Sequence, residues 1–192
     1  AVNMNRWSYM PQSTYQIRRK AYRFFEREYP GQFDLYGIGW NAPCVFYEKW
    51  FGYPHFTSYR GPIDIAFDAK VRKIATYRFA LCFENNASEP GYVSEKITDC
   101  FCARCVPVYY GSKGADELIP RDAWIDLRDF RDLAQLGRFL SGMGEAEHRK
   151  YLDAIDRFMQ SDRIDFFSTD HWFGVIADRL GFPAQGARCE RS

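Results

Sequence analysis

A tyrosine, a glutamate and a lysine lie close together in the segment 77–111, YRFALCFENNASEPGYVSEKITDCFCARCVPVYYG. The pattern predicts a strand, a polar loop, a helix and a second strand. Tyr92, Glu95 and Lys96 then gather where a helix begins after a strand of a parallel sheet. Backbone N–H groups and the positive end of the helix dipole favour phosphate at such a point. We therefore expect a nucleotide or nucleotide-sugar site there.

The apolar periodicity of the rest of the chain predicts the elements that position this site. Strands that alternate with helices indicate a parallel sheet covered on both faces, so the expected fold class is α/β and Rossmann-like. The expected strands cover 2–4, 33–38, 78–83, 106–110 and 124–127, and the expected helices cover 14–28, 66–76, 94–104, 131–140, 145–160 and 165–180.

The length of 192 residues suits one domain with a substantial core. We expect that domain to span 1–182, with an irregular aromatic insertion at 39–62 and a helical ending at 145–180. The last helix is expected to align its apolar side chains along one face. The tail at 183–192 is expected to be flexible.

Charge and cysteine content restrict the class of protein. The 26 basic and 25 acidic residues nearly cancel, so no broad electrostatic attraction to nucleic acid is expected. The C-x-C-x-x-C run has no second pair of ligands for zinc, so we expect free buried thiols and no metal site, with a metal site or disulfides as alternatives. No catalytic role is expected for the three histidines, of which His148 is expected on an exposed helix. The six cysteines are Cys44, Cys82, Cys100, Cys102, Cys105 and Cys189.

The ordered run CFEN…GYVSEKITDCFCARCVPVYYG resembles the donor-binding motif of glycosyltransferase family 10, the α-1,3/4-fucosyltransferases. The similarity extends more loosely from about residue 17 to residue 140. It implies the C-terminal, donor-binding half of a GT-B glycosyltransferase with GDP-fucose as the donor. In that family an N-terminal domain holds the acceptor and the catalytic base, so this chain is expected to need such a domain or a partner subunit.

The resemblance implies catalytic roles for two residues. Lys96 would bind the pyrophosphate and stabilise the charge that collects on GDP as the sugar leaves, although a solvated helix lysine is the plainer reading. Glu95 would contact the sugar and stabilise an oxocarbenium-like transition state, or simply favour the first turn of the helix. The family pattern places the donor also against Tyr92, Val93 and Ser94, Tyr92 having a packed aromatic as its alternative.

Three residues outside this run complete the predicted donor site. Arg18 matches the arginine that clamps the diphosphate, although its basic neighbours leave the register open and a solvated basic face would explain them all. Asn85 ends a strand at the edge where ligands bind, or serves as a turn residue. Lys70 falls where the family shapes its guanine pocket.

The leading hypothesis is inverting transfer of L-fucose from GDP-fucose to a hydroxyl of a glycan acceptor, without an obligate metal. The alternatives are a non-catalytic nucleotide-sugar-binding module and a transferase that uses another nucleotide sugar. Free thiols favour a reducing compartment, so a cytoplasmic location is expected. Peripheral attachment at an inner membrane, or the Golgi lumen for a truncated eukaryotic chain, are the alternatives.

Overall fold

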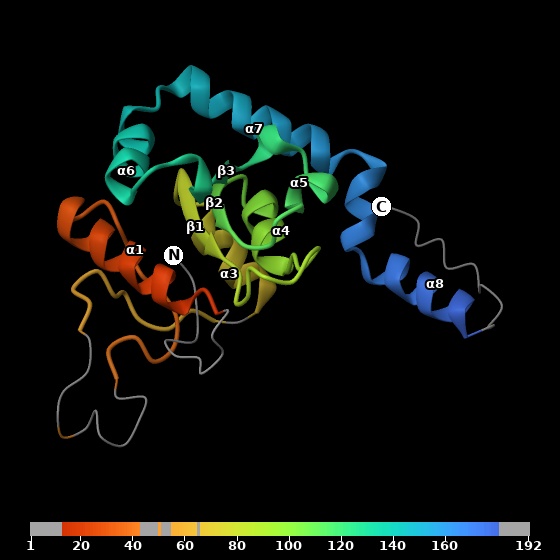
Figure 1. Cartoon of the computed structure of the whole chain (residues 1–192), viewed down its shortest axis with the longest axis horizontal. Coiled ribbons are helices and arrows are strands. Elements are labelled where there is room, and N and C mark those ends of the chain that lie inside the picture. The colour runs from red at the N-terminus through yellow and green to blue at the C-terminus, as the bar shows by residue number, and fades with distance from the viewer. Residues whose placement is uncertain (1–12, 43–49, 51–54, 65, 181–192) are drawn as a thin grey trace.

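The computed structural model describes residues 13–42, 50, 55–64 and 66–180 (Figure 1). Its centre is a parallel sheet in the order β1-β2-β3, formed by Phe79–Phe83, Val106–Tyr110 and Ile125–Asp126. These strands confirm the three that were predicted downstream of residue 77. The α/β fold class with a parallel sheet is therefore confirmed.

Helices surround the sheet, and their bounds agree with the predicted ones to within a few residues except near the C-terminus. Two short 3-10 turns and the helix α5 were not predicted. The helices are α1 Tyr15–Glu28, α3 Phe67–Ile74, α4 Glu95–Cys102, α5 Ala115–Leu118, α6 Leu133–Gly142, α7 Glu145–Met159 and α8 Thr169–Arg179, and the 3-10 segments are η1 Arg121–Ala123, η2 Leu127–Asp129 and η3 Asp162–Phe167.

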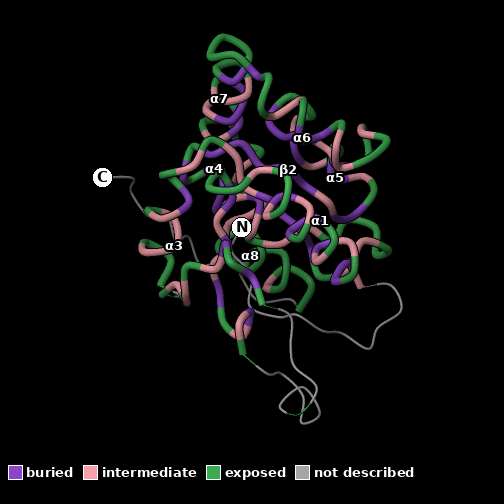
Figure 2. The backbone as a smooth tube through the Cα atoms, turned by 90° about the vertical axis from the view of Figure 1, so that its left-hand side faces the viewer, coloured by how far each residue is buried: buried purple, intermediate pink, exposed green. Residues whose placement is uncertain are grey.

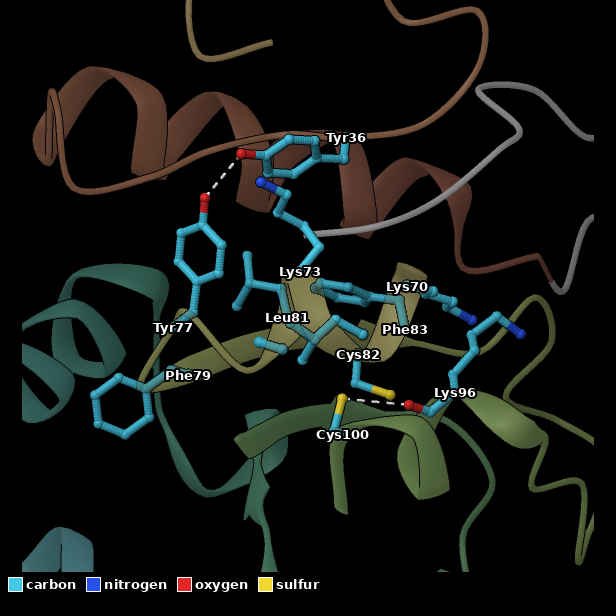
Figure 3. A pocket seen from close by; sticks show the side chains of 12 residues that line it. Tyr36, Lys70, Lys73, Tyr77, Phe79, Leu81, Cys82, Phe83, Lys96 and Cys100 are labelled. Carbon is cyan, nitrogen blue, oxygen red and sulfur yellow. Dashed lines mark hydrogen bonds between the residues drawn. The ribbon is translucent and has the colours of Figure 1, made fainter. Parts of the chain in front are cut away.

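Helices α1 and α4 cover opposite faces of β1 (Figure 1). Successive side chains of a strand point to opposite faces. Phe83 packs edge-on against Tyr22 of α1, with the ring centroids 6.0 Å apart. Its neighbour Cys82 lies beside Cys100 of α4 (Figure 3). The two helices therefore approach the same strand from its two sides, and both begin near its carboxyl end.

Strand β2 runs through the interior of the domain (Figure 2). A proline is unusual within an inner strand because it has no N–H to donate. Here Pro107 lies opposite Ala80 of β1, whereas the short β3 pairs only with Val108 and Tyr109. Pro107 therefore lies where the strand has one neighbour, and the sheet tolerates it.

The helix α4 ends in a Schellman motif that returns the chain to β2. The Cys105 N–H donates to the carbonyl oxygen of Cys100 at 2.9 Å, and the Arg104 N–H donates to that of Phe101 at 2.9 Å. Arg104 has a φ of 48°, the left-handed conformation that this motif requires. The turn joins α4 tightly to the central strand.

Two predicted elements are corrected by the structure. Residues 33–38 are extended but form no strand: the Leu35 N–H donates to the Ser58 carbonyl, and only an isolated bridge links Leu35 to Tyr59. Gly37 has a φ of 131°, and its N–H donates to the Gly61 carbonyl at 3.1 Å. The predicted helix over 165–180 is divided between η3 and α8, because the Ser168 side chain caps α8 by accepting from the His171 N–H.

The helical ending differs from the expectation in exposure as well. The apolar residues predicted to form one face of the last helix are solvent-exposed, since α8 has no buried residue. His148, expected on an exposed surface, is buried, and its Nε2 lies 3.2 Å from the carbonyl oxygen of Arg78. The predicted strand at 2–4 and the tail at 183–192 lie outside the described residues. The exposed residues that were predicted to share this face are Trp172, Phe173, Ile176 and Leu180.

No helix among the described residues combines the length and the apolar character needed to cross a lipid bilayer.

Gly111 follows β2 at a point where no side chain fits. A Cβ built there would lie 2.5 Å from Cζ of Tyr109 and 2.6 Å from Cγ of Glu84. We expect Gly111→Ala to lower the free energy of unfolding by about 1–3 kcal/mol, as overpacking in a core does. Urea unfolding measures this. Gly142→Ala is the matched control because nothing lies within 4 Å of a Cβ there; an equal effect of both substitutions would contradict the packing argument.

Candidate functional site

Glu84 lies directly after β1 with its side chain fully buried, and three donors meet its carboxylate. The Ser94 N–H donates to Oε1 at 2.8 Å, and the Ser94 hydroxyl donates to Oε2 at 2.7 Å. The Lys96 ammonium donates to Oε2 at 3.0 Å. A buried carboxylate requires such partners, because an unpaired charge in the interior is very costly. All three donors come from the segment that begins α4.

Lys96 is held by this carboxylate at the first turn of α4. Its Nζ also lies 2.9 Å from Oγ of Ser94, and 18% of its side chain is exposed. Burial disfavours the lysine charge, but the carboxylate of Glu84 more than offsets this and raises the pKa of Lys96 above its ordinary value. An ammonium has three hydrogens. Two of them are accounted for by Glu84 and Ser94, which leaves one for an anion at the exposed edge.

Arg18 reaches the same strand end from α1. Its Nη2 donates to the carbonyl oxygens of Phe83 at 3.1 Å and Glu84 at 3.2 Å, and to Oδ1 of Asn85 at 3.2 Å. The side chain is 1% exposed and its guanidinium lies over the ring of Tyr15. The arginine that the sequence predicted is thus the one that points inward to the strand end.

The two cations therefore meet at one residue. Glu84 accepts from Arg18 through its main-chain carbonyl and from Lys96 through its carboxylate. The N-terminus of α1 is fixed there as well, since the Thr14 hydroxyl donates to the Glu84 carbonyl and the Thr14 N–H donates to the Asn85 carbonyl at 3.1 Å. The structure brings Arg18, Asn85 and Lys96 to one edge of the sheet, where parallel α/β folds bind ligands.

The remaining residues of the predicted motif lie around this edge. Tyr92 is 38% exposed and ends the loop that precedes the helix. Glu95 is exposed at the first position of α4, and Val93 packs partly against the core. Ser94 is the N-cap of α4, its hydroxyl accepting from the Lys96 N–H. Their roles toward a donor stay predictions.

Lys70 lies on α3, and 20% of its side chain is exposed, about as much as for Lys96. Its ammonium is paired with the buried carboxylate of Asp99 on α4. It shares with Lys96 a small cavity of about 40 Å³ between α3, β1 and α4, also lined by Cys82 and Tyr77 (Figure 3). That volume admits a few water molecules but no nucleotide. The cavity is thus a small, partly open space beside the site, and a guanine contact by Lys70 stays a prediction.

The cysteines of the described residues are free thiols, as expected. Cys82, Cys100 and Cys105 are buried and Cys102 is exposed, whereas Cys44 and Cys189 lie outside the described residues. A hydrogen bond from the Cys82 thiol to Cys100, together with burial, raises the pKa of Cys82 well above its ordinary value. Within the part of the chain that the structure describes, no three histidine, cysteine or carboxylate side chains group as metal ligands do.

Glu84 is the residue of this site that the sequence argument missed. Glu84 is the glutamate of the FEN motif, for which the resemblance implied no role. One signal was present: a carboxylate that directly follows the apolar run FALCF must be buried or lie at the strand end. Since a buried carboxylate needs a cation, a basic partner was to be expected nearby.

The ion pair between Glu84 and Lys96 predicts an asymmetric mutational response. Lys96→Met should lower the free energy of unfolding by about 3 kcal/mol, because it leaves a buried charge without its partner. Adding Glu84→Gln to Lys96→Met should recover part of that loss. Urea unfolding at neutral pH checks both, with Lys150→Met on the exposed face of α7 as the control. A double variant that is less stable than Lys96→Met would contradict the pairing.

A family model and several known proteins match parts of this chain. The model of glycosyltransferase family 10 (fucosyltransferase), C-terminal region, matches residues 46–163. Alpha-(1,3)-fucosyltransferase 7 of Homo sapiens is 35% identical over 115 residues, which are 57% of this chain and 32% of that protein. The same enzyme of Bos taurus is 36% identical over 101 residues, 51% of this chain and 28% of the relative. The chain thus spans about a third of the length of these relatives.

Solved structures show the same fold. A crystal structure of alpha1,3-fucosyltransferase with GDP matches with a TM-score of 0.54 at 19% identity, over 79% of this chain and 36% of that one. The complex of alpha1,3-fucosyltransferase with GDP-fucose matches with a TM-score of 0.52 at 20% identity, over the same shares. The family match covers more than half of the sequence, from residue 46 to residue 163. The chain therefore belongs to glycosyltransferase family 10 (fucosyltransferase), of which it contains the C-terminal region.

Proposed function

We propose that this chain is the donor-binding domain of a fucosyltransferase that transfers L-fucose from GDP-fucose with inversion. The observation that carries the proposal is the cationic edge at the end of β1, where Arg18 and Lys96 meet at Glu84. Two structural relatives are described with GDP-fucose and with GDP, which supports the same class of donor here.

The proposed reaction is a direct displacement. An acceptor hydroxyl oxygen attacks the anomeric carbon of the fucose, and the bond between that carbon and the β-phosphate oxygen breaks. The bonding electrons go to GDP, and the hydroxyl proton goes to a general base. Lys96 and Arg18 would stabilise the charge that develops on the diphosphate. Glu95 would stabilise the positive charge that develops on the sugar.

We propose that this reaction needs no obligate metal ion. An ammonium held at a helix N-terminus and a guanidinium can together supply positive charge to a departing diphosphate. Lys96 is placed in this way at the start of α4, and Arg18 lies at the adjacent strand end. Their charges support the proposal, and chelator-treated full-length protein would test it through retained transfer.

The acceptor site and the general base are proposed to come from an N-terminal domain or a partner subunit. The chain spans about a third of its curated relatives, so much of a complete transferase lies outside it. Glu95 is not proposed as the base, because its role would be to contact the donor sugar. The acceptor in this proposal is a glycan hydroxyl.

Titration calorimetry with GDP tests the donor site directly. We expect binding to the unsubstituted chain, and a loss of about tenfold in affinity for Lys96→Met, equal to about 1.4 kcal/mol. Lys150→Met is expected to bind as the unsubstituted chain does. If the folded chain binds neither GDP nor GDP-fucose, the proposed function is wrong.

A second titration separates the nucleotide from the sugar. Glu95→Gln should leave GDP affinity within about twofold but remove much of the preference for GDP-fucose over GDP, since a hydrogen bond to a charged group is worth about 1.5–3 kcal/mol. Glu89→Gln removes another exposed carboxylate of the preceding loop and serves as the control. Equal losses for GDP and GDP-fucose in Glu95→Gln would exclude a sugar contact.

A second candidate is a non-catalytic nucleotide-sugar-binding module, since Arg18 and Lys96 at the end of β1 can attract a diphosphate without any transfer of the sugar. Donor binding by the full-length protein without fucose transfer to any glycan acceptor would support that candidate. Preferential binding of another GDP-sugar, such as GDP-mannose, would instead support a transferase with a different donor.

A further inference from the structure

We propose that Glu84 is a positioning residue of the donor site, which acts by holding Lys96 in place for the diphosphate. Glu84 itself would not touch the donor in this proposal. The inference deepens the proposed function and rests on it. It assigns a task to the one fully buried carboxylate at the cationic edge.

The geometry leaves the carboxylate little freedom. Both of its oxygens are used: Oε1 accepts from the Ser94 N–H at 2.8 Å, and Oε2 accepts from the Ser94 hydroxyl at 2.7 Å and the Lys96 ammonium at 3.0 Å. The donors come from two positions of a single helix start. A carboxylate with three donors is fixed in orientation, and so is the lysine that it holds.

The backbone of Glu84 is anchored independently of its side chain. Its N–H donates to the carbonyl of Tyr110 on β2 at 2.9 Å, and its carbonyl accepts from Arg18 at 3.2 Å and from the Thr14 hydroxyl. The sheet and α1 therefore hold the main chain of Glu84, while its carboxylate holds the start of α4. The position of Lys96 is therefore set by the sheet and not by the loop that precedes the helix.

The charge of the Glu84 carboxylate favours the protonated, positively charged form of Lys96. Lys96 is largely buried, which by itself favours the neutral amine, and Glu84 restores the charged form. Glu84 and Ser94 accept hydrogen bonds from two of the three ammonium hydrogens of Lys96, and the third is left for a phosphate oxygen. A flexible lysine would first have to lose its rotamer freedom when the donor binds, at a cost in affinity.

A double-mutant cycle distinguishes this role from the alternatives. GDP affinity is measured by calorimetry for Glu84→Gln, for Lys96→Met, for the double variant and for the unsubstituted chain. We expect Glu84→Gln to lower GDP affinity about tenfold alone, and by less than about twofold in the Lys96→Met background, because coupled residues are not additive. The same loss in both backgrounds would mean a general structural effect, and tighter binding by Glu84→Gln would mean direct repulsion of the phosphate. Either outcome overturns the proposal.

The chain offers a matched control in Glu26. Its carboxylate accepts from the Ser58 N–H at 2.9 Å, from the Ser58 hydroxyl at 2.6 Å and from Arg23 at 3.3 Å, the same three kinds of donor. Glu26→Gln should therefore perturb a similar network without changing GDP affinity. If Glu84→Gln does not fold, Glu84→Asp keeps the charge, shortens the reach and enters the same cycle.

An NMR titration of the Lys96 ε-carbon gives a readout independent of the nucleotide. We expect the pKa of Lys96 to fall in Glu84→Gln and to stay unchanged in Glu26→Gln. A Lys96 signal that titrates alike in Glu84→Gln and in the unsubstituted chain would overturn the inference about Glu84 alone. Absence of GDP binding by the unsubstituted chain would overturn the proposed function, and the role of Glu84 within it, whatever the lysine signal shows.

Discussion

A carboxylate buried at the end of β1 sets the arrangement of everything around it. Glu84 cannot stay charged in the interior without partners, and the chain supplies them from α4. Its main-chain carbonyl accepts hydrogen bonds from Arg18 and Thr14, which anchors the start of α1. One residue thus joins the two helices that flank the strand, and both cations of the candidate site contact its polar groups.

The surrounding packing follows from this requirement. Tyr109 lies close to Glu84, and burial together with the nearby carboxylate charge raises the pKa of its hydroxyl. Tyr109 and Glu84 leave no room for a side chain at Gly111, so the residue that follows β2 must be a glycine. The short helix α4 is likewise fixed at both ends, by its Ser94 cap and by its C-terminal turn at Arg104. Rigid surroundings are what a site for a flexible donor requires.

Local patterns in the sequence predicted the strands and helices of the core well, because their periodicity reflects burial. The family motif, and not a local pattern, singled out Arg18 among its basic neighbours on α1; it is the one that reaches the strand end, and its role toward a donor stays a prediction. The failures were contacts that no local pattern encodes. Whether residues 33–38 pair as a strand depends on the irregular segment near Ser58, and the burial of His148 depends on a carbonyl 70 residues away. Glu84 escaped notice because a strand-end acid reads equally well as a solvated turn residue.

The separation of α1 from β1 along the chain has a consequence for how the domain assembles. The contact of Arg18 with Phe83 closes a span of 65 residues, whereas β1, α4 and β2 follow one another directly. Because the entropic cost of loop closure grows with its length, we expect the strand–helix–strand unit to form first and α1 to dock later. The nascent site would then carry Lys96 before Arg18. A diphosphate that binds both cations would shift the equilibrium of this last step toward the docked α1 by mass action. The ligand would then take part in completing the fold.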